Sequence, residues 1–311
     1  MSCRAMNRLS PFSAALLALL VLMHLGFSAP VRAYDAEIHQ QLTFIAARQL
    51  NRCMQADSRV PLLSALETRY IAKANVAQAD PNVFVRMFRW PYYNRADQTN
   101  RSTLGVIDTR FHDHFKALLR DMEEANSRRQ QLRELGRVIN YVQDVSSPAH
   151  AVPVYTGRWW RLSMGDRFDR YRLRSERVES AAQSLCGALL PKPVSLSAVL
   201  ADAAQETIHA VQGPITGFPA TWESYWQLAQ NEDEFGEYGR AGNSFGERTE
   251  FRCGAEERCL LLENDPLYEE FAQQRHVSAV LATMRAMYLF QAATLVSDEV
   301  NSVSSGTAQN R

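Results

Sequence analysis

The stretch GRVINYVQDVSSPAHAVPV, from Gly136 to Val154, predicts an amphipathic helix that ends in a proline turn, with a carboxylate and an imidazole at the two ends of the junction between helix and loop. Asn140 and Asp144 lie one turn apart, on a side of this helix that differs from its apolar stripe. Pro148 ends the helix, and His150 follows on the turn within reach of Asp144. The apolar stripe has the period of an α-helix and consists of Leu132, Leu135, Ile139, Val142 and Val145.

Asp144 and His150 are both residue types that bind metal ions. A carboxylate together with an imidazole suits zinc. The alternative is a purely structural one, in which Asp144 caps a neighbouring element and His150 occupies an ordinary loop, because a short motif alone is a hypothesis. The stretch therefore predicts a candidate metal site and leaves this alternative open.

Helical periodicity also dominates the rest of the chain, and no sustained strand alternation competes with it. The segments Asp80–Ile107 and Glu232–Glu263 lack this period, so we expect loops there, with a hairpin as an option. We therefore predict an all-α fold, with a single multi-helix domain over residues 34–311 and long irregular loops. The expected helices run over Asp35–Cys53, Leu62–Gln78, Phe111–Ala125, Arg128–Val145, Val178–Leu189, Ser197–Val211 and Pro266–Ser297.

Residues 1–33 have the pattern of a secretory signal peptide. Arg4 and Arg8 precede an apolar run from Phe12 to Phe27, and the residues before Tyr34 offer a cleavage site after Ala33. No later segment is long and apolar enough to cross a bilayer. We therefore expect an exported protein, periplasmic or secreted, that begins at Tyr34 and has no transmembrane segment.

The net charge and the cysteine count indicate which partners and which cellular compartment to expect. Loss of residues 1–33 removes three arginines and no acidic residue, which leaves 31 basic against 34 acidic residues from the original 34 of each. The net charge of −3 does not favour a polyanionic partner. Four cysteines remain, and an even number in an exported chain predicts disulfides, with Cys253–Cys259 as a small loop and Cys53–Cys186 as the long-range pair. Other pairings stay open.

The segment from Gly136 to His150 resembles the signature of the zinc-dependent phospholipase C and single-strand-specific nuclease family. Members of that family begin with a Trp whose free amine and carbonyl bind zinc, and the nuclease branch has a His five residues later. Here Tyr34 would be the first residue, and His39 stands five residues on. The resemblance covers Tyr34 to about Tyr171, roughly half of the expected mature chain, and it fades beyond.

Further positions extend the resemblance. Asp80, in NVAQADPN, is similar to a family aspartate, and WPYYN at 90–94 is similar to an aromatic segment around a histidine ligand. GDRFDRY at 165–171 is similar to the HxxxD or HxxxE element, with Asp169 at the acidic position. The resemblance thus implies Tyr34, His39, Asp80, Asp144, His150 and Asp169 as metal ligands, with Asp80 also as the catalytic residue.

Three histidines of the family pattern are missing. Asn140, Tyr92 and Gly165 stand at their positions. In the family three zinc ions share these ligands, and the ion at the chain terminus would keep Tyr34, His39 and Asp144. The second would keep two aspartates but have Asn140 and Tyr92 in place of imidazoles, and these oxygens suit a harder ion. The third would keep only His150 and Asp169. We therefore treat Tyr92 and Asn140 as doubtful ligands. Asp166 is a third doubtful ligand, because it is the neighbour of Gly165.

Other charged and imidazole side chains have ordinary alternatives. His112 and His114 cannot share one helix face, and at most one of them would compensate for a lost ligand. His209 and His276 lie on apolar helices and are expected to be core or surface residues. Arg133 and Arg137 lie on the same side of the helix as Asn140. They either form a solvated face or contact a phosphate oxygen.

The resemblance implies an exported metal-dependent phosphodiesterase with one to three zinc ions. In that chemistry the ions polarise the phosphoryl oxygens, Asp80 orients or deprotonates the attacking water, and Asp144 bridges two ions. A phospholipid head group, met at a membrane surface, is favoured over nucleic acid because the chain lacks a basic surplus. The alternative is a non-catalytic or accessory metal-binding member with an incomplete zinc cluster. An unrelated helical protein is a third reading, in which the matches arise by chance.

Overall fold

The computed structural model describes residues 34–55, 60–79, 93–95, 110–154, 165–186, 195–232 and 234–308, with side chains described as far as residue 293. The helices are α2 (Ala36–Met54), α3 (Ala65–Ala79), α5 (Phe111–Glu123), α6 (Arg128–Asp144), α7 (Pro148–Ala151), α8 (Ser175–Ser184), α10 (Leu196–Gln212) and α11 (Pro266–Ala308), with 3-10 turns η2 (Phe168–Arg170) and η3 (Trp222–Ser224). The strands are β1 (Trp226–Gln227), β2 (Glu237–Tyr238), β3 (Thr249–Arg252) and β4 (Arg258–Leu261).

The prediction of a mainly helical fold is confirmed, since every helix expected from the periodicity is present in the described residues. The start of α8 differs from the prediction: it begins at Ser175, before the expected Val178, because its first turn is polar and has no apolar period. α11 continues to Ala308, beyond the expected Ser297. The predicted signal peptide and most of the predicted loop Asp80–Ile107 lie outside the described residues.

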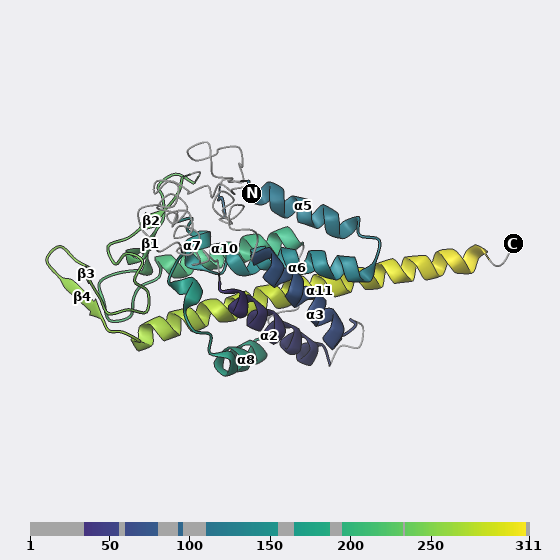
Figure 1. Cartoon of the computed structure of the whole chain (residues 1–311), viewed down its shortest axis with the longest axis horizontal. Helices are drawn as coiled ribbons and strands as arrows, with labels where there is room; N and C mark the ends of the chain where they lie inside the picture. Colours follow the sequence, from purple (N-terminus) through teal and green to yellow (C-terminus); the bar gives the residue numbers. More distant parts are fainter. Residues whose placement is uncertain are drawn as a thin grey trace, which may run out of the picture.

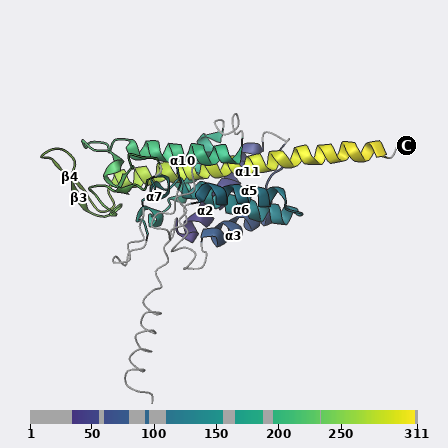
Figure 2. The ribbon, with the colours of Figure 1, turned by 90° about the horizontal axis from the view of Figure 1, so that it is seen from above.

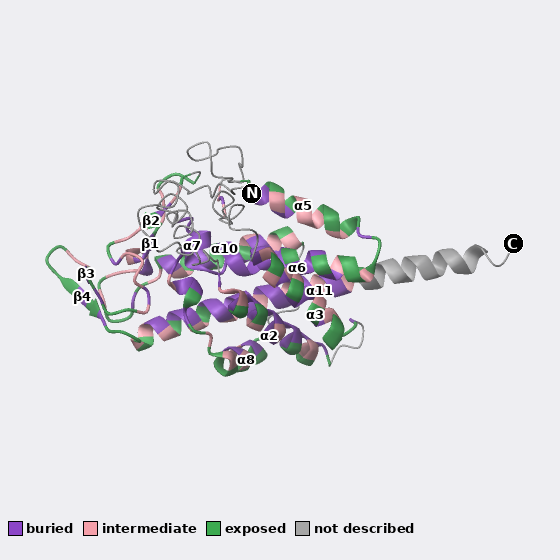
Figure 3. Cartoon of the chain, in the orientation of Figure 1, coloured by how far each residue is buried: buried purple, intermediate pink, exposed green. Residues whose placement is uncertain are grey.

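The long helix α11 runs along the long axis of the molecule and forms the centre of the packing (Figure 1). Helices α2, α6, α8 and α10 all contact it, α3 packs on α2 and α6, and α5 packs on α6. In the view from above, α10 lies on one side of α11, and α2, α3 and α6 lie on the other (Figure 2). The buried faces of these helices meet in the interior (Figure 3), where two apolar clusters form the core.

Local sequence explains where several helices begin. Ser127 and Ser195 precede α6 and α10, and each hydroxyl accepts a hydrogen bond from the backbone N–H three residues later. Ser64 and Glu67 form a reciprocal capping box at the start of α3, since each side chain accepts from the other residue's backbone N–H. Pro148 occupies the first turn of α7, where its missing N–H costs nothing.

Gly136 allows α6 to lie close against α3. A Cβ atom at this position would sit 2.3 Å from the backbone oxygen of Ile71 and 2.8 Å from the Cβ of Ala74. No real side chain tolerates such distances, so the glycine is needed for the approach of the two helices. This approach places the following turns of α6 against α2, where Asn140 and Asp144 lie.

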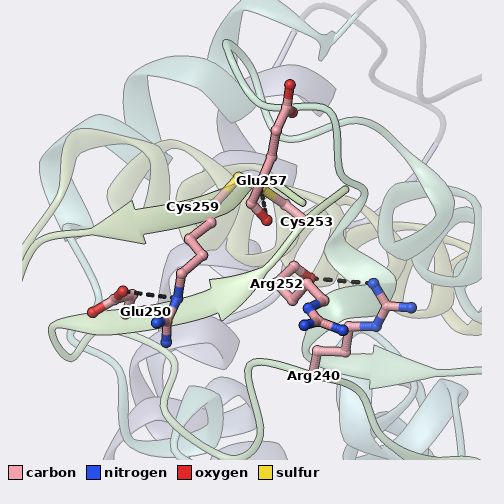
Figure 4. Close-up of a disulfide and its surroundings, with 7 residues drawn as sticks. Arg240, Glu250, Arg252, Cys253, Glu257 and Cys259 are labelled. Atoms are coloured by element: carbon pink, nitrogen blue, oxygen red, sulfur yellow. Dashed lines mark hydrogen bonds and ion pairs between the residues drawn. A yellow bond between two sulfur atoms is a disulfide. The ribbon is translucent and has the colours of Figure 1, made fainter. Parts of the chain in front are cut away.

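Two disulfides are present, Cys53–Cys186 and Cys253–Cys259, as expected. The first ties α2 to the end of α8. The second closes the tip of the antiparallel β3–β4 hairpin, which confirms the hairpin left open for the segment Glu232–Glu263. Figure 4 shows this tip, where Arg240 also donates to the carbonyl of Arg252. Among the described residues, no helix has the length and apolar character needed to span a membrane.

Candidate metal centre

His39 and Asp144 meet in the interior of the helix bundle. His39 lies in the first turn of α2, and Asp144 is the last residue of α6. The imidazole Nε2 is 3.2 Å from Oδ1 of Asp144, and both side chains are almost wholly buried, at 0% and 1% exposure. The sequence therefore placed these two residues together correctly, although they are more than 100 positions apart.

The other ring nitrogen of His39 is held by Gln143. Nδ1 lies 2.7 Å from Oε1 of Gln143. The orientation of the Gln143 amide follows from its other side, where Nε2 donates to the hydroxyl oxygens of Thr43 and Thr283. Both hydroxyls donate their own protons to helix carbonyls, of His39 and Ala279, so they can only accept from Gln143. Oε1 therefore faces His39, and Nδ1 carries the proton.

A neutral His39 consequently presents an unprotonated Nε2 to Asp144, and the Asn140 amide donates to the same nitrogen at 3.4 Å. The Oδ1 atom of Asp144 is buried and has no hydrogen-bond donor. A lone pair and a carboxylate oxygen at 3.2 Å repel one another unless a proton or a cation lies between them. The geometry resembles known metal sites in one respect, since a ligating histidine there commonly donates its second ring N–H to a fixed acceptor.

Asn140 lies beside this pair, on the side of α6 that the sequence indicated. Its Nδ2 donates to Oδ1 of Asn75 at 3.1 Å and lies 3.4 Å from Nε2 of His39. Asn75 in turn donates to Oε1 of Gln143 and to the hydroxyl of Thr43. The amide of Asn140 is thus part of a buried polar network.

His150 and Asp169 form a second carboxylate–imidazole pair. Nε2 of His150 is 3.5 Å from Oδ2 of Asp169, and exposures are 3% and 2%. The hydroxyl of Ser147 donates to the other carboxylate oxygen at 2.5 Å. His150 lies on α7 and Asp169 on η2, so the turn after α6 contributes to this pair as expected.

Tyr34 joins the two pairs. Its ring stands edge-on to His39, with centroids 5.7 Å apart, and the next backbone N–H, of Asp35, donates to the carbonyl of Asp169. The side chain of Tyr34 is fully buried between Phe168 and His276. Burial, followed by the negative charge of Asp169, raises the pKa of the Tyr34 hydroxyl well above its usual value. The burial of this ring has a physical cause, since a large aromatic side chain is stabilised when its apolar surface leaves water.

Asp166 has partners of another kind. Its Oδ2 accepts from the indole N–H of Trp226 and the hydroxyl of Tyr238, both at 2.9 Å, and Oδ1 accepts from the N–H of Phe168. Burial, with the nearby Asp169, raises the pKa of this carboxyl to about 6. These hydrogen bonds account for the buried carboxylate, and we assign Asp166 a structural role.

Three further histidines of the described residues have other surroundings. Nε2 of His112 is 2.7 Å from the carbonyl oxygen of Asn94, and His209 is exposed. His276 packs 5.6 Å from the Tyr34 ring, with a buried Nε2 that has no partner, and burial lowers its pKa to about 3. His276 is therefore a neutral core residue next to the candidate centre. Arg137 pairs with Glu134, which fits a solvated face.

Asp80 and Tyr92 lie outside the described residues. Within the part of the chain that the structure describes, no group of three or more His, Cys, Asp or Glu side chains could hold a metal ion. The described centre thus consists of two pairs linked by Tyr34. Sequence reasoning missed the polar residues that surround His39, because amides and hydroxyls have no motif of their own: Thr43, Asn75, Gln143, Ser147 and Thr283.

Neither a family model, nor a curated protein, nor a solved structure matches this chain.

Proposed function

We propose that this chain is an exported metal-dependent phosphodiesterase with a chemistry similar to that of zinc phospholipase C. The observation that carries the proposal is the 3.2 Å approach of Nε2 of His39 to Oδ1 of Asp144 inside the bundle. A proton on Nε2 would satisfy this contact in the absence of metal, and a divalent cation would accept both atoms.

The residues present fit such an ion in chemistry. One imidazole nitrogen and one carboxylate oxygen are common zinc ligands, and the buried Oδ1 of Asp144 lacks any other partner. Structural and catalytic zinc sites need at least three protein ligands. Tyr34 through its amine and carbonyl, if cleavage follows Ala33, and Asp80 are the proposed sources of the rest.

The surrounding residues hold this geometry in place. A bound metal ion would polarise a phosphoryl oxygen and acidify a water molecule. Gln143 keeps the His39 ring turned toward Asp144, and Ser147 keeps Asp169 turned toward His150. Asp80 is the proposed base that orients the attacking water. A phospholipid head group is the favoured substrate, because a small phosphoester needs no extended basic track.

A second candidate is a non-catalytic, accessory metal-binding protein of the same fold. The observation that favours it is Asn140, whose amide lies 3.4 Å from Nε2 of His39, where the family resemblance implies a histidine. An amide oxygen is a weaker zinc ligand than an imidazole nitrogen. In this reading the chain would bind one ion without hydrolysing a diester.

The test combines metal content and hydrolysis, measured on protein that begins at Tyr34. His39→Ala and Asp144→Asn should each remove at least one zinc ion per chain and abolish cleavage of a chromogenic phosphodiester. His209→Ala, a change at an exposed histidine, is the matched control and should leave both unchanged. Zinc binding without hydrolysis would favour the accessory protein, and equal zinc content in all variants would refute both readings.

A further inference from the structure

A second site lies on the outer side of η2, facing away from the carboxylate of Asp169. It is a cavity of about 410 Å³ whose wall includes Arg167, Arg170 and Arg172. Glu263 is the one acidic residue that lines it, as far as the described residues go. The alternation of the segment explains the arrangement: Phe168 and Asp169 point into the core, while the arginines on either side reach the surface.

Positive charge on this face exceeds what the neighbouring carboxylates neutralise. Arg167 pairs with Glu247 at 2.7 Å. Arg172 shares a single carboxylate, that of Glu269, with two further arginines, Arg174 and Arg177. The side chain of Arg170 is exposed and has no hydrogen-bond or ion-pair partner among the described residues. Five arginines thus meet three carboxylates, those of Glu247, Glu263 and Glu269, and the excess creates a positive potential at the cavity.

The wall of the cavity is rigid. Tyr171 is 9% exposed, and its hydroxyl has no hydrogen-bond partner. Gly246, at φ +84°, lies next to the Tyr171 ring, and a Cβ at this position would come within 2.9 Å of a ring carbon. Asn243 clamps the arginine segment, because its amide accepts from the N–H of Arg167 and donates to the carbonyl of Gly165. The guanidinium groups are therefore mounted on a fixed backbone.

We propose that this cavity binds a phosphate group. Arginine guanidinium groups match the geometry of phosphate oxygens, and a phosphomonoester carries a charge of about −1.5 to −2, which three guanidinium groups can balance. The volume falls within the range of small-ligand sites, which begins at about 300 Å³. The phosphate could belong to a soluble phosphomonoester or to an anionic lipid head group. This site does not depend on the proposed metal chemistry.

The experiment uses metal-free protein and two probes, with binding measured at fixed ionic strength. The soluble probe is glycerol 3-phosphate, followed by calorimetry. The surface probe is a set of phosphatidylcholine vesicles with and without phosphatidic acid, followed by co-sedimentation. Binding to the first alone assigns a soluble ligand, and binding to the second alone assigns a lipid surface.

The variants separate a site from general charge. Arg170→Gln should weaken binding of the probe about tenfold or more, the effect of losing a charged hydrogen bond. Glu263→Gln should strengthen binding, because it removes the acidic residue of the lining. Arg120→Gln changes the net charge equally at an exposed residue of α5 and should have no effect. Absence of binding, or equal effects of Arg170→Gln and Arg120→Gln, would overturn the proposal.

Discussion

The Nδ1 atom of His39 lies 2.7 Å from Oε1 of Gln143, and this contact determines which ring nitrogen of a neutral His39 carries no proton. The Gln143 amide cannot turn over, since the hydroxyls of Thr43 and Thr283 accept from its Nε2. A buried amide network of this kind is stable only when all its members are satisfied. The candidate metal centre therefore depends on side chains that bind no metal themselves.

Gln143→Leu should weaken zinc binding by about 10- to 100-fold, because the ring of His39 loses the acceptor that orients it. The readouts are zinc affinity, by competition with a chromophoric chelator, and the tautomer of His39 in the metal-free protein, by nitrogen NMR shifts. Gln143→Glu keeps the acceptor and should retain the tautomer. Gln205→Leu, on the exposed side of α10, is the control. An unchanged tautomer in Gln143→Leu would contradict the role of Gln143.

Asn140→His should raise the zinc content and any phosphodiesterase activity. An imidazole binds zinc more strongly than the amide, and residue 140 already faces Nε2 of His39. The measurement is zinc per chain together with the rate of diester hydrolysis, compared with Asn51→His on the partly exposed side of α2. If neither quantity changes, the centre serves another task.

Protein that retains residues before Tyr34 should bind at least one zinc ion fewer than protein that begins at Tyr34. The proposed ligand is a free α-amine, with an ordinary pKa near 8, which must lose its proton to bind a metal. Both forms should have the same helical content by circular dichroism. Equal zinc content in the two forms would remove the chain terminus from the centre.

Tyr34→Ala should destabilise the fold, since the Tyr34 ring is fully buried against His39 and Phe168. Loss of a large buried aromatic ring costs about 3 to 5 kcal/mol. Tyr34→Phe keeps the ring and removes a hydroxyl that has no partner, so it should be near neutral. Urea denaturation of the three proteins measures both effects, and equal midpoints for wild type and Tyr34→Ala would show that the ring contributes nothing.

Gly136→Ala should destabilise the bundle by about 1 to 3 kcal/mol, the usual cost of overpacking. The added methyl would meet the carbonyl oxygen of Ile71, a backbone atom that cannot move without shifting α3. Gly213→Ala is a milder test of the same change, because there the nearest atom is 3.1 Å away. A smaller loss at residue 136 than at residue 213, by thermal unfolding, would show that α3 and α6 are less tightly packed than the structure indicates.

The helical fold could be predicted from the sequence, which also favoured the two disulfide pairs that are present, and the family resemblance implied that His39 and Asp144 lie together. Helical periodicity is a local property of the chain, and the cysteines were few enough for their spacing to suggest a pairing. The first residue of α8 was predicted three residues too late, because its polar first turn has no apolar period. Export, the metal ion and the substrate remain predictions.

The polar surroundings of the candidate metal centre could be found only in the tertiary structure. Gln143 and Asn75 are polar residues on helices, and nothing in their sequence neighbourhood shows that they will be buried together. Asp166 was a doubtful ligand, and its carboxylate accepts a hydrogen bond from the indole of Trp226, 60 residues away. The ring of Tyr34 is packed against Phe168 and His276, which are distant in the sequence. The physical reason is that hydrogen bonds and burial act between whichever side chains packing brings together, whatever their separation along the chain.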